Sequence, residues 1–325
     1  MRLAAPLLLF LALAAPAEAF LFGRTSDKKA AGLLAEMRSS FDRGDCAGVE
    51  AASAGFLAEK PPAELREEAY GYLGRCYERG GSADKAISIY KLALGFYPEN
   101  IFFSSRLAFI YNQAGFSANA VPLFLKVLEL RSDDVAANLG LARAYAALGF
   151  YAKAKAFYSR AVALQDFSDD ATLREYAACM LKKRDWPETL FIAGRGAQAA
   201  PAAAHWPLVK ARAMAGQGDY YKALPLMEAA NRLEPSRRLR LERALYLLLA
   251  GLPGRAIEAA DAELAADKSD ALAAAIKGMG LYRQGRKTEA KEYFTTARGG
   301  GPFTSGLAAS FLNGSGVNPE GSCKN

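Results

Sequence analysis

Residues 141–164 read LARAYAALGFYAKAKAFYSRAVAL, where small alanines and one glycine separate aromatic and long aliphatic residues. In the first half of this stretch the apolar residues recur at spacings of three and four, which is the period of one face of an α-helix. A second apolar stripe with the same spacing follows Gly149, and glycine suits a turn that needs a positive φ. The stretch therefore predicts two short helices joined by a turn.

The same residue pattern recurs every 34 positions. Residues 67–100, 101–134 and 135–168 can be overlaid without a gap, and five columns then hold equivalent residues. The columns are Leu73, Leu107 and Leu141; Tyr77, Tyr111 and Tyr145; Gly81, Gly115 and Gly149; Ala86, Ala120 and Ala154; and Tyr90, Phe124 and Tyr158. Less regular copies cover residues 30–63, 170–203, 204–237, 237–270 and 271–304, so we expect about eight units.

Two helices alone cannot bury both of their apolar faces, so each pair must stack on the next in a one-dimensional array. Small residues such as Ala142 and Ala154 allow close helix approach and leave room for large neighbours such as Tyr145 and Phe124. A larger side chain at the small positions would overpack the array, at a typical cost of about 1–3 kcal/mol. This requirement explains the alternation of small and large residues.

A 34-residue period with this residue order resembles the tetratricopeptide repeat, in which a Leu-Gly or Leu-Ala pair precedes a tyrosine and a closing proline follows later. The pairs Leu73-Gly74, Leu107-Ala108 and Leu141-Ala142 fit that pattern. The resemblance covers residues 30–304. It implies an all-α, right-handed superhelical solenoid of about eight helix-turn-helix repeats.

Four positions depart from the family pattern. Ala193 and Ala260 stand where a large residue is expected, and Gly196 and Glu263 stand at a usual alanine position. We expect the units that contain them to pack more loosely or to bend the array.

The first twenty residues, MRLAAPLLLFLALAAPAEAF, combine a positive charge, an apolar run and the small-residue triplet Ala17-Glu18-Ala19. This order is typical of a secretory signal peptide, with cleavage after Ala19. The apolar run is shorter than the about 20 residues that cross a bilayer. We therefore expect an exported bacterial protein, periplasmic or secreted, with no transmembrane segment after cleavage. The remaining segments are predicted as a linker at 20–29, a capping helix at 303–313 and a flexible tail at 314–325.

The chain contains four cysteines, Cys46, Cys76, Cys179 and Cys323. If the repeat model holds, Cys46 begins the second helix of the first unit and Cys76 lies late in the next helix. Neighbouring helices of such a stack run antiparallel, which brings both residues toward the same end. In an oxidising compartment this predicts a Cys46–Cys76 disulfide, with two unrelated buried thiols as the alternative. The sequence assigns no role to Cys179 or Cys323.

The formal net charge of +7 in an exported protein favours acidic proteins, anionic lipid surfaces or acidic glycans over nucleic acid, with solubility alone as the alternative. The resemblance implies that the first helix of each unit lines a concave groove. The groove positions are Tyr72, Arg75, Phe102, Arg106, Phe109, Asn112, Arg143, Arg174, Leu208 and Arg212. Arginine binds carboxylates through two parallel hydrogen bonds, so this groove is predicted to bind an acidic or extended peptide, a chain terminus or an anionic glycan. The alternative is that these arginines are solvated or pair with Glu68, Glu78 and Glu175.

We find no catalytic or metal-binding pattern in the sequence. His205 is the only histidine, which excludes a histidine-rich metal site, and its position favours the exposed start of a helix. The acidic pairs Asp133-Asp134 and Asp169-Asp170 each precede a predicted helix, where carboxylates cap free amide groups. We therefore expect neither a cofactor nor enzymatic activity.

The favoured interpretation is a non-catalytic protein-interaction scaffold of the bacterial cell envelope. Binding of an anionic glycan in polysaccharide export or cell-wall assembly is the main alternative. An α-helical carbohydrate-active enzyme is the least favoured reading, because it would need two facing carboxylates.

Overall fold

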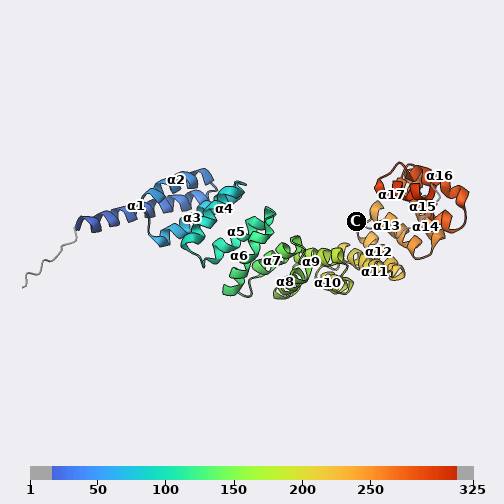
Figure 1. Ribbon diagram of the computed structural model, residues 1–325, viewed down its shortest axis with the longest axis horizontal. Coiled ribbons are helices and arrows are strands. Elements are labelled where there is room, and N and C mark those ends of the chain that lie inside the picture. The colour runs from blue at the N-terminus through green and yellow to red at the C-terminus, as the bar shows by residue number, and fades with distance from the viewer. Residues whose placement is uncertain (1–16, 313–325) are drawn as a thin grey trace, which may run out of the picture. The chain divides into compact units, whose positions relative to one another are not determined.

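The computed structural model of the chain describes residues 17–312, and all regular structure within them is α-helical (Figure 1). The helices of the first half are α1 (Ala17–Asp42), α2 (Cys46–Ala58), α3 (Ala63–Arg79), α4 (Ala83–Phe96), α5 (Ile101–Gln113), α6 (Ser117–Leu130), α7 (Val135–Ala147) and α8 (Tyr151–Leu164). Those of the second half are α9 (Asp170–Lys183), α10 (Trp186–Ala199), α11 (His205–Gly216), α12 (Tyr220–Leu233), α13 (Arg237–Leu249), α14 (Pro253–Ala266), α15 (Ala271–Arg283), α16 (Lys287–Ala297) and α17 (Pro302–Leu312).

The helices follow one another as eight pairs, from α1 and α2 to α15 and α16, and α17 comes after the last pair. This arrangement confirms the predicted fold class, an all-α repeat solenoid that ends in an additional helix. Within the described part of the chain, no helix has both the length and the apolar character needed to cross a membrane.

The ends of the chain differ in part from expectation. The predicted signal peptide lies almost entirely outside the described residues, as do the predicted tail and Cys323. Residues 20–29, for which we expected a linker, lie within α1. No proline interrupts the sequence from Ala17 to Asp42, so nothing in it forces the helix to begin later.

The chain divides into two compact units, with the boundary between Ala154 and Lys155 inside α8. Each is described by itself. Unit 1 contains α1 to α7, and its core is made of apolar residues from consecutive helices, among them the fully buried Met37, Phe56 and Tyr90. Unit 2 contains α9 to α17, and a single large apolar cluster extends through it from α11 to α17.

Small and large residues of neighbouring helices meet closely. In unit 1 a methyl group added to Gly140 on α7 would lie 2.3 Å from the Cζ atom of Phe124 on α6. Gly74 on α3 and Tyr90 on α4 form the same kind of contact, at 2.4 Å. An aromatic ring of a second helix thus lies against the bare backbone of a neighbouring first helix, and only glycine leaves it room. The turn glycines Gly115 and Gly149 have φ values of +81° and +82°, as predicted.

The irregular positions of unit 2 are buried, and side chains of neighbouring helices contact Gly196 and Glu263. Ala193 and Ala260 are fully buried. Gly196 provides the space for the ring of Trp206, because a methyl group at this glycine would lie 2.2 Å from the ring. Glu263 is also buried, and Arg240 binds its two carboxylate oxygens at 2.5 and 3.1 Å.

The capping predictions are confirmed for one carboxylate of each acidic pair. Asp134 accepts a hydrogen bond from the backbone N–H of Ala137 at 2.8 Å, and Asp169 accepts one from Thr172 at 3.0 Å. Such side-chain caps satisfy backbone donors that have no partner inside the helix.

Cys46 and Cys76 are joined by a disulfide in the structure, with their Cα atoms 5.2 Å apart. Cys46 is the first residue of α2 and Cys76 lies in the last turns of α3. Cys179, on α9, is a free, half-buried thiol, and burial raises its pKa.

Candidate functional site

Nine of the ten predicted groove residues line hollows of the structure. Within unit 1, four of them line one pocket, and Arg75 and Phe102 line another hollow nearer the N-terminus. Arg174, Leu208 and Arg212 line a pocket of unit 2. Tyr72 lines none of these three. The hollows of each unit are described in turn.

The pocket of unit 1, here called the apolar pocket, has a volume of about 570 Å³ and is formed by α5, α6 and α7. Phe109, Phe124 and Leu139 supply most of its apolar wall, and Arg106 and Arg143 supply its positive charge. The other lining residues are Ser105, Asn112, Gln113, Ser117, Ala136, Gly140 and Ala147. The lining thus combines an apolar wall with two guanidinium groups and no carboxylate.

Arg106 is held in place by Glu78 of α3. Its Nε atom donates to Glu78 Oε1 at 3.0 Å and its Nη2 atom donates to Oε2, and these bonds raise the pKa of Arg106. The Tyr90 hydroxyl donates to the same Oε1 atom at 2.6 Å. The guanidinium carbon lies 5.3 Å from the centre of the Phe109 ring. Arg106 is therefore fixed by its neighbours, as one of our alternatives for the groove arginines proposed.

Asn112 connects α5 and α7, which are the first helices of two successive repeats and both border the apolar pocket. Its Nδ2 atom donates to the backbone carbonyl of Gly140 at 2.8 Å, from α5 to α7. Its Oδ1 atom is buried and has no hydrogen-bond partner among the described residues. The buried Oδ1 atom without a partner costs free energy of folding, which offsets part of the stabilisation from the hydrogen bond to Gly140.

The hollow nearer the N-terminus, formed by α3 and α5, is acidic rather than basic. Arg75 and Phe102 line it together with three glutamates, Glu64, Glu67 and Glu68. The Arg75 guanidinium lies 4.3 Å from the centre of the Phe41 ring and donates through Nε to the Gly71 carbonyl at 3.1 Å. The predicted acid-binding groove therefore does not extend to this end of unit 1.

Tyr72 is buried, with 8% of its surface exposed. Its ring packs against Phe41 of α1 with the ring centres 5.1 Å apart. Its hydroxyl donates to Glu68 at 2.7 Å and accepts from Arg38 at 3.0 Å. Helix α1 covers α3 at this place, so the position that the repeat assigns to a groove becomes part of the core.

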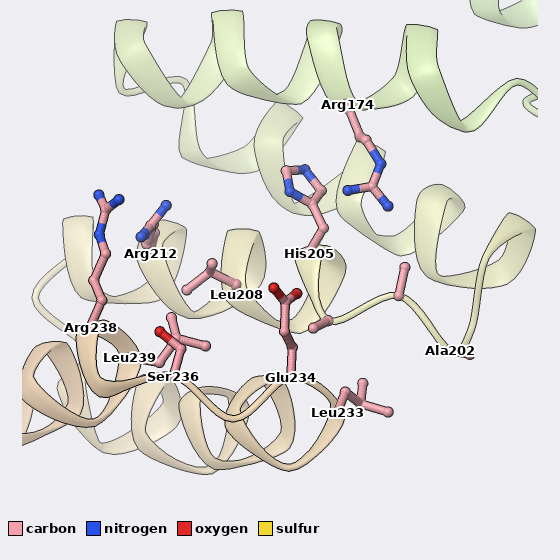
Figure 2. Close-up of a pocket in the computed structure, with 12 residues that line it drawn as sticks. Arg174, Ala202, His205, Leu208, Arg212, Leu233, Glu234, Ser236, Arg238 and Leu239 are labelled. Atoms are coloured by element: carbon pink, nitrogen blue, oxygen red, sulfur yellow. The ribbon is translucent and has the colours of Figure 1, made fainter.

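The pocket of unit 2, here called the arginine pocket, has a volume of about 510 Å³ (Figure 2). It is lined by Arg174 of α9, by the start of α11, by the end of α12 and the segment after it, and by the start of α13. Besides the predicted Arg174, Leu208 and Arg212, its lining residues are Ala202, Ala203, Ala204, His205, Leu233, Glu234, Ser236, Arg238 and Leu239. Our sequence reasoning missed Arg238, although this residue holds the second position of the unit predicted at 237–270, which is a groove position in the family.

Two arginines of this pocket are anchored by carboxylates. Arg212 donates through Nε and Nη2 to the two oxygens of Glu242, both at 2.8 Å, and the hydrogen bonds to Glu242 raise its pKa. Arg174 donates through Nε to Asp170 at 2.6 Å, and Asp170 also accepts from the Trp206 indole N–H at 2.9 Å. Both guanidinium groups keep further N–H donors that these contacts do not use.

His205 is the first residue of α11 and is half-buried, close to the expected place at a helix start. Its Nε2 atom is buried without a hydrogen-bond partner among the described residues. Burial lowers its pKa, and the charges of Arg174 and Arg212 lower it further, against the opposing effect of Asp170. The imidazole is therefore neutral at pH 7. The described residues contain no group of three or more His, Cys, Asp or Glu side chains that could hold a metal ion.

The stacked helix pairs define an α-helical repeat protein whose units contain pockets of the size that binds small ligands. A family model described as a tetratricopeptide repeat matches residues 49–101 and 110–170. These two segments are similar to tetratricopeptide repeats, and the fold of the chain is that of tetratricopeptide-repeat proteins.

Solved structures with this fold share little sequence with the chain. A tetratricopeptide repeat protein from Parabacteroides merdae is 16% identical, with a TM-score of 0.52, and the match covers 76% of this chain and 98% of that one. The C-terminal part of a TPR repeat-containing protein from Cytophaga hutchinsonii is 14% identical, with a TM-score of 0.50, over 60% of this chain and 78% of that one. None of the curated protein sequences is significantly similar to this chain.

Proposed function

We propose that this protein is a non-catalytic scaffold that binds an extended segment of another protein in the apolar pocket of unit 1. The observation that carries the proposal is the composition of that pocket, in which Phe109, Phe124 and Leu139 form an apolar wall beside Arg106 and Arg143. Such a site holds an apolar side chain against the wall and a carboxylate at the guanidinium groups.

The two hollows of unit 1 give the bound segment a direction. The acidic hollow, with Glu64, Glu67 and Glu68, is formed by α3 and α5, and the apolar pocket with its two arginines is formed by α5, α6 and α7. A peptide that crosses these first helices is therefore expected to carry an acidic residue toward α7 and a basic or neutral residue toward α3. Charge placement of this kind selects one orientation and rejects the reverse one.

We also propose that the scaffold works in an exported, oxidising compartment of a bacterial envelope. The signal-like pattern of the first twenty residues and the Cys46–Cys76 bond support this proposal. N-terminal sequencing of the protein isolated from its host is expected to give a mature chain that starts at Phe20. A chain that keeps Met1 and remains in the cytoplasm would contradict this part of the proposal.

The peptide proposal can be tested by selecting random peptides on the full mature chain by phage display. We expect selected sequences to combine an apolar residue with Asp or Glu on one side and Lys or Arg on the other. Arg143→Glu reverses one charge of the apolar pocket and is expected to weaken the selected peptides about tenfold or more in fluorescence anisotropy.

A matched control is Lys91→Glu, which makes the same change in charge at an exposed residue of α4 outside the apolar pocket. Lys91→Glu is expected to leave the affinity within about twofold of the original, since distant surface charges contribute little at physiological salt. Equal weakening by both variants, or no enrichment of any sequence class, would contradict the proposed site.

A further inference from the structure

We propose that the arginine pocket of unit 2 binds the carboxylate or phosphate group of a small organic anion, with Arg212 and Arg238 as the principal donors. This site is separate from the apolar pocket and does not depend on the proposed peptide binding. It is carried by the lining of the cavity, in which three guanidinium groups and one carboxylate, that of Glu234, surround a volume of about 510 Å³.

Arg212 and Arg238 are the donors best prepared for an anion. The bidentate contact with Glu242 fixes the Arg212 guanidinium and leaves Nη1 without a partner in that contact. Arg238 is exposed and forms no hydrogen bond or ion pair with another described residue. Figure 2 shows both guanidinium groups on the same side of the pocket.

Glu242 lies within the electrostatic influence of both arginines. Burial of this carboxylate opposes its ionisation, yet the hydrogen bonds and charge of Arg212, and the charge of Arg238, hold its pKa below the usual range. Both positive charges thus act on Glu242, but its two oxygens are already bound to Arg212. The charge of Arg238 remains available to a ligand.

The backbone at the rim of the pocket adds to the positive potential. Helices α11 and α13 both begin there, and neither Ala204 nor Ser236 caps its helix with a side-chain hydrogen bond. In the same unit, α9 and α15 begin with the capping carboxylates Asp169 and Asp270. The first backbone N–H groups of α11 and α13 therefore keep their partial positive charge, which supports the arginines.

The size and walls of the pocket indicate what carries the anionic group. A volume of about 510 Å³ is within the range of pockets that bind small organic molecules. Leu208, Leu233 and Leu239 line it with apolar surface. The ligand is therefore an organic body of modest size that bears an oxyanion.

Two other titratable groups face the ligand. Glu234 reaches into the pocket between the two arginine-bearing sides (Figure 2) and repels an anion there. His205 lies on the side of Arg174 and is neutral at pH 7, so it adds no charge under these conditions. The anion is therefore best placed on the side of Arg212 and Arg238.

The test uses the full mature chain and three probes of similar size, glucuronate, glucose 6-phosphate and glucose, at constant ionic strength. Calorimetric titration is expected to show that one or both anions bind at least tenfold more tightly than glucose. The anion with the higher affinity identifies the recognised group as carboxylate or phosphate. If neither anion binds more tightly than glucose at concentrations up to about 10 mM, the proposal is wrong.

Variants connect the binding to the named residues. Arg238→Gln removes an exposed charge and leaves the bidentate contact between Arg212 and Glu242 in place, and it is expected to weaken the bound anion about tenfold or more. Glu234→Gln is expected to strengthen binding severalfold, because it removes the repelling charge. Arg255→Gln, at an exposed residue of α14 outside the pocket, serves as the control and is expected to change nothing. Equal affinity of Arg238→Gln and the original chain would overturn the assignment.

Discussion

Units 1 and 2 use the same helical scaffold and stabilise it differently. In unit 1 the residues at the repeat positions follow the 34-residue pattern closely, and a disulfide joins α2 to α3. In unit 2 the pattern is broken at several core positions, and other side chains fill the gaps, among them Trp206 beside Gly196. A repeat architecture thus tolerates the loss of a consensus residue when a neighbour supplies the missing volume or charge.

The two pockets extend the same contrast to binding. The apolar pocket lies among α5, α6 and α7, and the first helices α5 and α7 begin with the caps Asn100 and Asp134. The arginine pocket lies at the uncapped starts of α11 and α13. One helical scaffold thus contains two chemically different cavities.

The largest effect is expected from the disulfide, which should stabilise unit 1 alone. Replacing Cys46 and Cys76 by serine opens a 30-residue loop and is expected to lower the free energy of unfolding of unit 1 by about 3–4 kcal/mol. Native-state hydrogen exchange of α2 and α3 measures this change, with Cys179→Ser as the control. Identical exchange under oxidising and reducing conditions would show that the bond does not contribute.

A methyl group added to Gly140 tests the contact between glycine and ring that the regular repeat uses. Gly140→Ala places Cβ against the Phe124 ring and is expected to destabilise unit 1 by about 1–3 kcal/mol. Gly95→Ala, in α4 with nothing within 4 Å of the new atom, is expected to stabilise it by about 0.5–1 kcal/mol. Chemical denaturation measures the change in stability of each variant. Changes of the same sign would contradict the proposed contact between glycine and ring.

The only histidine gives unit 2 a pH dependence that unit 1 lacks. Because burial lowers the pKa of His205 in the folded state, the unfolded chain takes up its proton first as the pH falls. The contribution of His205 to the free energy of unfolding is therefore complete above the ordinary histidine pKa. It decreases as the pH falls below about 6.5, with a slope of no more than about 1.4 kcal/mol per pH unit. His205→Gln is expected to remove this slope between pH 7 and 5, and a slope that survives in the variant would assign it to another group.

The smallest effect concerns a turn of unit 2 where the repeat has lost its glycine. Arg184 has a φ of +60°, a conformation that glycine adopts in seven other turns of the described chain. Arg184→Gly is expected to stabilise the protein by about 0.5–1 kcal/mol, since relief of left-handed strain slightly exceeds the entropy cost of glycine. In unit 1, Gly149→Ala is expected to lower the free energy of unfolding by a similar amount. If thermal unfolding shows Arg184→Gly to be destabilising, the side chain has a role that the turn geometry does not explain.

The local features of the fold could be predicted from the sequence because they repeat. The leucine, alanine and aromatic columns indicated the helix pairs and their packing, and the acidic pairs before two helices indicated the caps Asp134 and Asp169. Gly115 and Gly149 reported the turns through their need for a positive φ. Each of these signals depends on residues within one or two repeats of each other.

The candidate site was less predictable because its properties depend on which particular side chains meet, and these differ from one repeat to the next. The repeat places Arg106 on a groove, but only the structure pairs it with Glu78, 28 positions away. The repeat places Tyr72 on the same groove, but α1 covers it and Phe41 packs on its ring. Position within a repeat therefore predicts where a side chain lies on its helix. It does not predict which residues contact that side chain.

The claim on which the functional account depends is that the apolar pocket of unit 1 holds a segment of another protein. Site-specific photo-crosslinking in the native host tests it directly, with benzoylphenylalanine at Leu139 inside the pocket or at the exposed Leu125 of α6 outside it. We predict a discrete polypeptide adduct from position 139 that Arg143→Glu abolishes, and none from position 125. No adduct at position 139, or the same adducts from both positions, would contradict the account.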